Sequence, residues 1–147
     1  MRYWGIHTRG HLPEIRMVID SSALVAVLAK EPEAHVMAEA IAADPKRLVS
    51  AVSVLETGIV IEARYGPAGG RELDLLLHRC RMDMVPLTSE QVELAREAYR
   101  QFGKGSHPAG LNLGDCAAYA LARLTGELLL FKGDDFGQTD IRTVSYA

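Results

Sequence analysis

Five acidic side chains stand where a predicted strand ends or a predicted helix begins. They are Asp20, Glu56, Asp115, Asp134 and Asp135. In an open parallel sheet, ligands bind at the carboxyl ends of the strands. These acids lie far apart in the sequence, so only a tertiary fold of this kind can bring them into one site.

Several carboxylates in one pocket repel one another, and burial raises their pKa values. A bound divalent cation removes this repulsion. Mg²⁺ prefers oxygen ligands, keeps several waters and is held by one or two carboxylates together with substrate phosphate. It can activate water and neutralise charge on a phosphodiester in an in-line displacement. The acids therefore favour metal-dependent chemistry at a phosphodiester.

Each acid also has a purely structural interpretation. Asp20 precedes two serines and can cap a helix, and Asp115 follows Asn112 at the spacing of an acidic capping box. Glu56 can be a solvated helix residue, although its neighbours are apolar. Asp134 and Asp135 can be turn residues. No acid taken alone decides between structure and chemistry.

The elements that must position these acids alternate between strands and helices. Short apolar segments predict strands at 17–20, 47–50, 84–86, 128–131 and 142–145. Capping residues and helical periodicity predict helices at about 23–30, 32–43, 52–65, 72–81, 89–102 and 113–125. The first of these helices takes its N-cap from Ser21 or Ser22, and the glycine-rich segment 66–70 separates the third from the fourth.

Strands separated by helices imply right-handed crossovers and a parallel sheet that is covered on both faces. We therefore expect an α/β fold, a three-layer α/β/α sandwich with a parallel sheet of four or five strands. The length of 147 residues fits a single domain. Residues 1–16 differ from the rest in composition, so we expect an N-terminal extension there and the folded domain at 17–147.

The composition narrows the class of protein. Hydrophobic residues make up 48% and charged residues 24%, as in ordinary globular proteins. The longest apolar runs are too short to span a membrane, and two cysteines without a CxxC pair suit a cytoplasmic protein. The net charge of −3 argues against a protein that coats nucleic acid by bulk positive charge.

Four short motifs carry a resemblance to a known family. They are Val18-Ile-Asp20-Ser-Ser-Ala-Leu24, Ser53-Val-Leu-Glu56-Thr57, Leu111-Asn-Leu-Gly-Asp115-Cys116 and Leu130-Phe-Lys-Gly-Asp-Asp135-Phe136. In this order the motifs resemble the PIN-domain family and, within it, the VapC-type toxins of bacterial toxin–antitoxin pairs. The resemblance extends from about residue 17 to residue 144.

The resemblance implies an endoribonuclease that depends on Mg²⁺ or Mn²⁺ and hydrolyses RNA phosphodiester bonds with a metal-activated water. It implies that Asp20 and Asp115 are metal ligands and that Glu56 and Asp135, chosen over Asp134, complete a catalytic acidic pocket. It places Ser22, or else Ser21, near the metal or the scissile phosphate. It also implies a small cognate antitoxin protein and a homodimer.

Basic residues near the acids are candidates for contact with RNA. Lys104 lies in the glycine-rich loop before Asp115, and Lys132 precedes the last acids. Because single-stranded RNA is held by local positive charge and stacking, we predict that both lysines guide phosphates toward the metal. The alternative is that the glycine-rich loop that carries Lys104 is a solvated loop without contact with RNA.

Other functions find less support in the sequence. The chain contains neither GxxxxGK[ST] nor a GxGxxG after its first strand, which argues against nucleotide hydrolysis and dinucleotide binding. Two alternatives stay open: a PIN-like protein-binding module without turnover, and another Mg²⁺-dependent phosphohydrolase. An aspartate-nucleophile phosphatase would want a second Asp at position 22, where this chain has Ser22.

Overall fold

A parallel sheet of four strands runs through residues 16–146, the part of the chain that the computed structural model describes. The strands are β1 (Arg16–Ile19), β2 (Lys46–Ser50), β3 (Asp83–Val85) and β4 (Leu128–Leu130). Their order in the sheet is β3-β2-β1-β4, so the first strand lies in the interior. In this register Val18 pairs with both Leu48 and Leu129.

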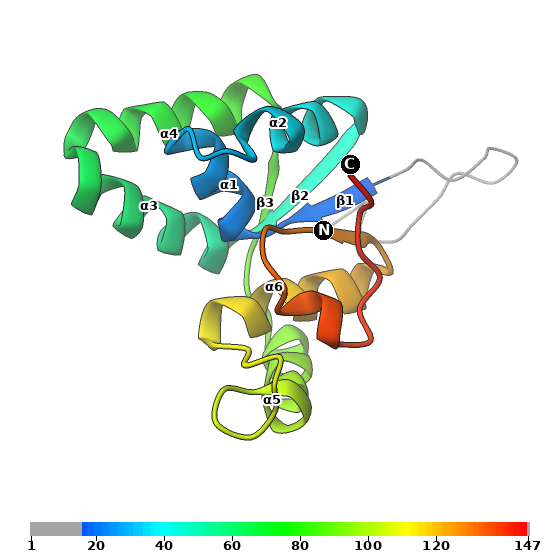
Figure 1. Cartoon of the computed structure of the whole chain (residues 1–147). Helices are drawn as coiled ribbons and strands as arrows, with labels where there is room; N and C mark the ends of the chain where they lie inside the picture. Colours follow the sequence, from blue (N-terminus) through cyan, green and yellow to red (C-terminus); the bar gives the residue numbers. More distant parts are fainter. Residues whose placement is uncertain (1–15, 147) are drawn as a thin grey trace, which may run out of the picture.

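Helices cover both faces of this sheet (Figure 1). On one face lie α1 (Ser21–Leu28), α2 (Ala34–Ala43), α3 (Ala51–Tyr65) and α4 (Pro67–Arg79). On the other face lie α5 (Ser89–Phe102) and α6 (Leu113–Thr125). A short 3₁₀ helix, η1 (Phe136–Gln138), follows β4. The predicted α/β/α sandwich is confirmed.

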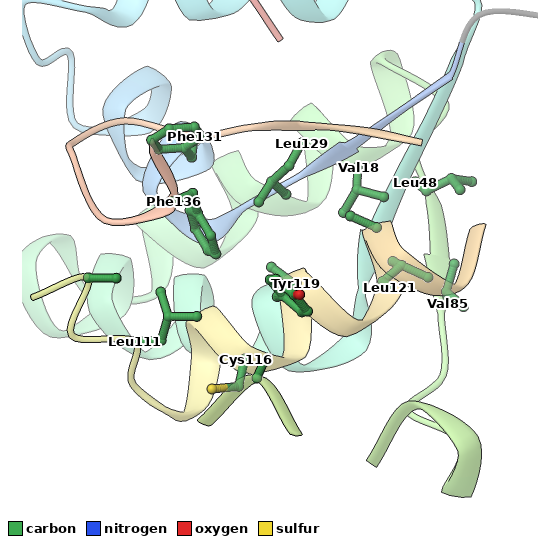
Figure 2. Packing of buried hydrophobic residues seen from close by; sticks show 14 residues of the cluster. Val18, Leu48, Val85, Leu111, Cys116, Tyr119, Leu121, Leu129, Phe131 and Phe136 are labelled. Carbon is green, nitrogen blue, oxygen red and sulfur yellow. The ribbon is translucent and has the colours of Figure 1, made fainter. Parts of the chain in front are cut away.

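Successive side chains of each strand point to opposite faces of the sheet, so buried side chains pack against both layers of helices. Val18, Leu48, Val85 and Leu129 join the cluster that packs against α6 (Figure 2). Their strand neighbours Met17, Ile19, Val49 and Leu130 join the cluster beneath α1 and α2. Because successive side chains of a strand point to opposite faces, β1, β2 and β4 each contribute to both halves of the core.

The predicted starts of α1 and α4 were wrong. Helix α1 begins at Ser21, because Asp20 is its N-cap and accepts a hydrogen bond from the backbone N–H of Ser22 at 3.0 Å. Helix α4 begins at Pro67, so only Gly66, with φ of +68°, separates it from α3. Proline suits the first turn of a helix, where no intrahelical partner for its nitrogen is needed. Gly69 then permits a close helix contact, since a Cβ there would lie 2.6 Å from Cγ2 of Ile61.

The predicted strand at 142–145 is reduced to a single bridge. Leu129 donates its N–H to the carbonyl of Arg142 and accepts from the N–H of Val144, both at 2.9 Å. Only Leu129 and Thr143 pair. This segment lies beside the outer edge of β4, which is itself three residues long and offers little edge for a longer ladder.

Within the described residues, no helix is long and apolar enough to cross a membrane. The predicted N-terminal extension, apart from Arg16, which opens β1, falls outside the part of the chain that the structure describes.

Candidate active site

Asp20 stands directly after β1 and is the most buried of the candidate acids. Its backbone N–H donates to the carbonyl of Leu130 at 2.9 Å, which ties it to the end of β4. Its side chain is 2% exposed. The Oδ2 atom caps α1 through the N–H of Ser22, whereas the buried Oδ1 atom has no hydrogen-bond partner among residues 16–146.

Asp115 occupies the third position of α6 and takes part in a reciprocal capping box. Its N–H donates to Oδ1 of Asn112 at 2.9 Å, and its own Oδ2 accepts from the N–H of Asn112 at 3.0 Å. The predicted cap is therefore confirmed. Like Asp20, Asp115 uses Oδ2 to fix its side chain against a helix N-terminus, which is compatible with metal binding through the other oxygen.

Glu56 reaches the same region from α3. Oγ of Ser21 donates to Oε1 of Glu56 at 2.9 Å. The Glu56 carboxylate also lies against the backbone of Gly114, because a Cβ at Gly114 would overlap it. Gly114 is in the first turn of α6, whose N-terminal dipole favours a negative charge. Contacts with α1 and α6 thus hold Glu56 in place.

The charges of the four predicted acids act on one another. Burial raises the pKa of Asp20 to about 7 against two opposing hydrogen bonds from Ser22, and the charges of Asp115 and Glu56 raise it further. Burial also raises the pKa of Asp115, and Asp135 and Glu56 add to that effect. Asp135 is thus the member of the Asp134–Asp135 pair whose charge acts on Asp115.

The acids do not form a complete metal cage. No group of three or more His, Cys, Asp or Glu side chains in the described part of the chain lies close enough to hold an ion by itself. A site with an incomplete set of protein ligands suits Mg²⁺, because this ion keeps several waters and takes only one or two protein carboxylates. The buried oxygen of Asp20 and the hard carboxylate donors fit this ion.

The three predicted substrate-binding residues occupy different environments. Ser22 accepts a hydrogen bond from the N–H of Lys132 at 2.9 Å, and its side chain also interacts with the Asp20 carboxylate. Lys104 is exposed in the loop between α5 and α6. Nζ of Lys132 instead lies 2.7 Å from Oε1 of Glu31 and 3.5 Å from Oε1 of Glu33.

Two residues contribute more to the site than their sequence context indicates. The resemblance favours Ser22 over Ser21, yet Ser21 is the residue that donates to Glu56. The role of Gly114 depends on a contact between helices that are distant in sequence. The glycine directly before Asp115 was the available signal, since glycine is expected where another group approaches the backbone closely.

Comparison with known proteins assigns the chain to a family. The family model described as "PIN domain" matches residues 17–142, and this range contains all four acids. The chain belongs to the PIN-domain family. This PIN domain is also similar to Ribonuclease VapC30 of Mycobacterium tuberculosis, with 57% identity over 129 residues that cover 88% of the chain and 98% of the relative. The predicted family and its ribonuclease class are confirmed.

Solved structures show the same fold at lower sequence identity. The crystal structure of Mycobacterium tuberculosis VapC20, described as a Sarcin-Ricin loop cleaving toxin, superimposes with a TM-score of 0.73 at 17% identity, covering 87% of this chain and 98% of that one. A toxin–antitoxin complex from Klebsiella pneumoniae gives 0.65 at 16% identity, covering 84% and 92%. At these identities the likeness supports the fold alone.

Proposed function

We propose that this PIN domain is the toxin of a toxin–antitoxin pair and that it cleaves RNA as a Mg²⁺-dependent endoribonuclease, with Mn²⁺ as a substitute ion. The observation that carries the proposal is the meeting of Asp20, Glu56, Asp115 and Asp135 at the carboxyl edge of the sheet. Asp20 places a buried, unpaired carboxylate oxygen among the other acids. A group buried in this way normally finds a partner, and a cation would supply it.

Asp20 and Asp115 are the proposed metal ligands, and Glu56 and Asp135 complete the acidic pocket. When bound, Mg²⁺ would neutralise charge on the scissile phosphate and lower the pKa of an attacking water. Ser21 holds the Glu56 carboxylate, and the two capping interactions hold Asp20 and Asp115. Ser22 and Lys104 are proposed to contact the RNA.

Cleavage of RNA with and without metal tests the proposal. We expect wild-type protein to cut RNA with Mg²⁺, and we expect EDTA to stop the reaction. Asp115→Asn removes one proposed ligand and should lower the rate about a hundredfold or more, since loss of one group that supports transition-state charge typically costs about 10²–10³ in rate. Asp74→Asn, at an exposed acid of α4, is the matched control.

Two outcomes would contradict this function. Full cleavage by Asp115→Asn would remove the assigned mechanism. Hydrolysis of a small phosphomonoester without RNA cleavage would favour another Mg²⁺-dependent phosphohydrolase, and absence of both activities would favour a binding module.

A cognate antitoxin is part of the same proposal. The Klebsiella structure described above is a toxin–antitoxin complex, and the chain of it that matches shares this fold. We extend that arrangement to this protein, and we expect the antitoxin to suppress RNA cleavage when the two proteins are mixed.

We further propose a homodimer that forms through one apolar face. Leu55 and Ile59 of α3 are 65% and 63% exposed, and Leu113 of α6 is 79% exposed. These three side chains line a depression beside Glu56, and Leu113 also lines an adjoining one with Val92 of α5. Large apolar side chains gathered in this way mark an interaction site more often than single exposed ones do, and a second copy would cover them.

A further inference from the structure

The chain after β4 carries Asp135 to the active site on a short loop. The start of this loop is held by Lys132, whose N–H donates to Oγ of Ser22 at 2.9 Å. The ammonium of Lys132 donates to Oε1 of Glu31 at 2.7 Å. Glu31 belongs to the connection between α1 and α2, so Lys132 joins two segments that are 101 residues apart.

Other contacts fix the same loop at both of its ends. The Tyr146 hydroxyl donates to the carbonyl of Phe131 at 2.7 Å. The rings of Phe131 and Phe136 meet edge to face with centroids 5.2 Å apart, and Phe136 is buried directly after Asp135 (Figure 2). The residues between, 133–135, are exposed. The position of Asp135 therefore depends on how firmly residues 131, 132 and 136 are held.

The charges around Lys132 are already balanced within the protein. Glu33 lies 3.5 Å from its ammonium, and Nη1 of Arg64 lies 3.9 Å from Oε2 of Glu31. The side chains of Lys132 and Glu31 are 33% and 24% exposed, which shields their interaction from water more than a surface pair. An RNA phosphate at this ammonium would have to compete with two carboxylates that already balance its charge.

We infer that Lys132 and Glu31 are positioning residues for the cleavage reaction, which act by holding the loop that presents Asp135 to Asp115. The inference rests on the proposed function for its kinetic consequence, and it replaces the predicted contact between Lys132 and RNA phosphate. A phosphate contact and a loop tether make opposite predictions for Glu31.

Steady-state RNA cleavage by Glu31→Gln, Lys132→Met and the double variant tests the inference. A tether predicts that each single change lowers kcat about tenfold with KM within twofold, and that the double variant is no worse than either single one, because residues that act as one unit are not additive. Glu39→Gln, at an exposed acid of α2, is the neutral control.

Lys104→Met supplies the comparison for a true phosphate contact. It should raise KM and reduce the salt dependence of RNA binding by about one ion. If Lys132→Met behaves like Lys104→Met, or if Glu31→Gln tightens RNA binding by freeing the ammonium, the tether is wrong.

Hydrogen–deuterium exchange of residues 131–136 tests the tether without any activity. We expect Glu31→Gln to speed exchange in this segment while the strands of the sheet stay protected and the melting temperature changes by a few degrees. Unchanged exchange would overturn the inference. If wild-type protein does not cleave RNA, the proposed function fails on its own, and the exchange result still decides the tether.

Discussion

At the scale of single residues, the two carboxylate oxygens of Asp20, and likewise those of Asp115, have different roles in this site. Oδ2 of Asp20 and Oδ2 of Asp115 each cap the start of a helix. A cap fixes the rotamer of the carboxylate and so directs its second oxygen. The structural and chemical interpretations of these acids are therefore compatible, because one side chain can serve both.

Gly114→Ala should lower RNA cleavage at least tenfold while the protein stays folded. The added methyl group would overlap the Glu56 carboxylate and move it away from Ser21 and from the other acids. Cleavage assays and circular dichroism check this expectation. Gly58→Ala is the control, since its Cβ would make only ordinary contacts with Leu73 and Glu62, and alanine suits a helix better than glycine. Normal cleavage by Gly114→Ala would mean that Glu56 is not essential.

Asp20→Asn should abolish cleavage and change how stability depends on pH. Burial raises the pKa of Asp20 from 3.8 to about 7, so in the absence of metal the folded protein holds a proton that the unfolded chain has released. Between these two pH values the free energy of unfolding of the wild type falls by up to about 1.4 kcal/mol per pH unit from this group, and above pH 7 the loss is complete.

Urea unfolding in EDTA at pH 5 and pH 7.5 measures this effect. The asparagine variant should gain stability relative to wild type between the two pH values, and Mg²⁺ should stabilise only the wild type. Parallel pH dependences of the two proteins would contradict the burial of a titrating carboxyl at this position.

At the scale of elements, one arginine donates hydrogen bonds to backbone carbonyls at the C-terminal ends of two helices. Arg47, at the start of β2, donates from Nε to the carbonyl of Ile41 at 2.5 Å and from Nη2 to that of Ala42 at 3.2 Å, both in α2. Its Nη1 donates to the carbonyl of Cys80, the C-cap of α4, at 2.7 Å. A positive charge is favourable at a helix C-terminus, and the Arg47 guanidinium lies at the C-termini of both α2 and α4.

Arg47→Met should destabilise the protein by about 2–3 kcal/mol, because carbonyls of two helix ends lose a charged donor. RNA cleavage per folded molecule should be unchanged, since Arg47 lies toward the amino end of its strand and the acids lie at the carboxyl edge. Thermal unfolding and cleavage assays at low temperature check both parts. Arg71→Met, at an exposed arginine of α4, is the control. Equal stability of the two variants would show that the three hydrogen bonds contribute little.

At the scale of the whole molecule, charge and apolar surface have separate roles. The chain has a net charge of −3, and the charges of Asp115, Glu56 and Asp135 act within one region, where a bound divalent cation would offset part of the negative charge. Exposed apolar side chains of α3 and α6 line a depression together with Glu56, and an adjoining depression extends to α5. Substrate and partner can thus meet the domain on adjoining surfaces.

Leu55→Glu should convert the proposed homodimer to a monomer, because two buried carboxylates would face each other across a two-fold interface at considerable cost. Sedimentation velocity measures the oligomeric state. Leu75→Glu, at an exposed leucine of α4 on another part of the surface, should leave the dimer intact. A wild type that sediments as a monomer would contradict the homodimer, and a Leu75→Glu variant that alone dissociates would place the interface on α4 instead.

Local sequence was enough to predict much of the fold. The capping box at Asn112 is a short-range interaction, and it was predicted. The predicted break at 66–70 was too long, and the predicted strand at 142–145 is a single bridge. The glycines after Gly66 remain helical because α3 packs closely against them, and the segment near Thr143 meets only one residue of β4.

The sequence by itself determined the residue types of the site and their order: acids after apolar strands and at helix starts, in a pattern that resembles one family. Only the tertiary structure decided their partners. Ser21 holds Glu56, Gly114 makes room for its carboxylate, Asp135 rather than Asp134 acts on Asp115, and Glu31 engages Lys132. The physical reason is range: caps and turns depend on residues a few positions apart, whereas the packing of α1, α3, α6 and the β4 loop places side chains from distant segments in contact.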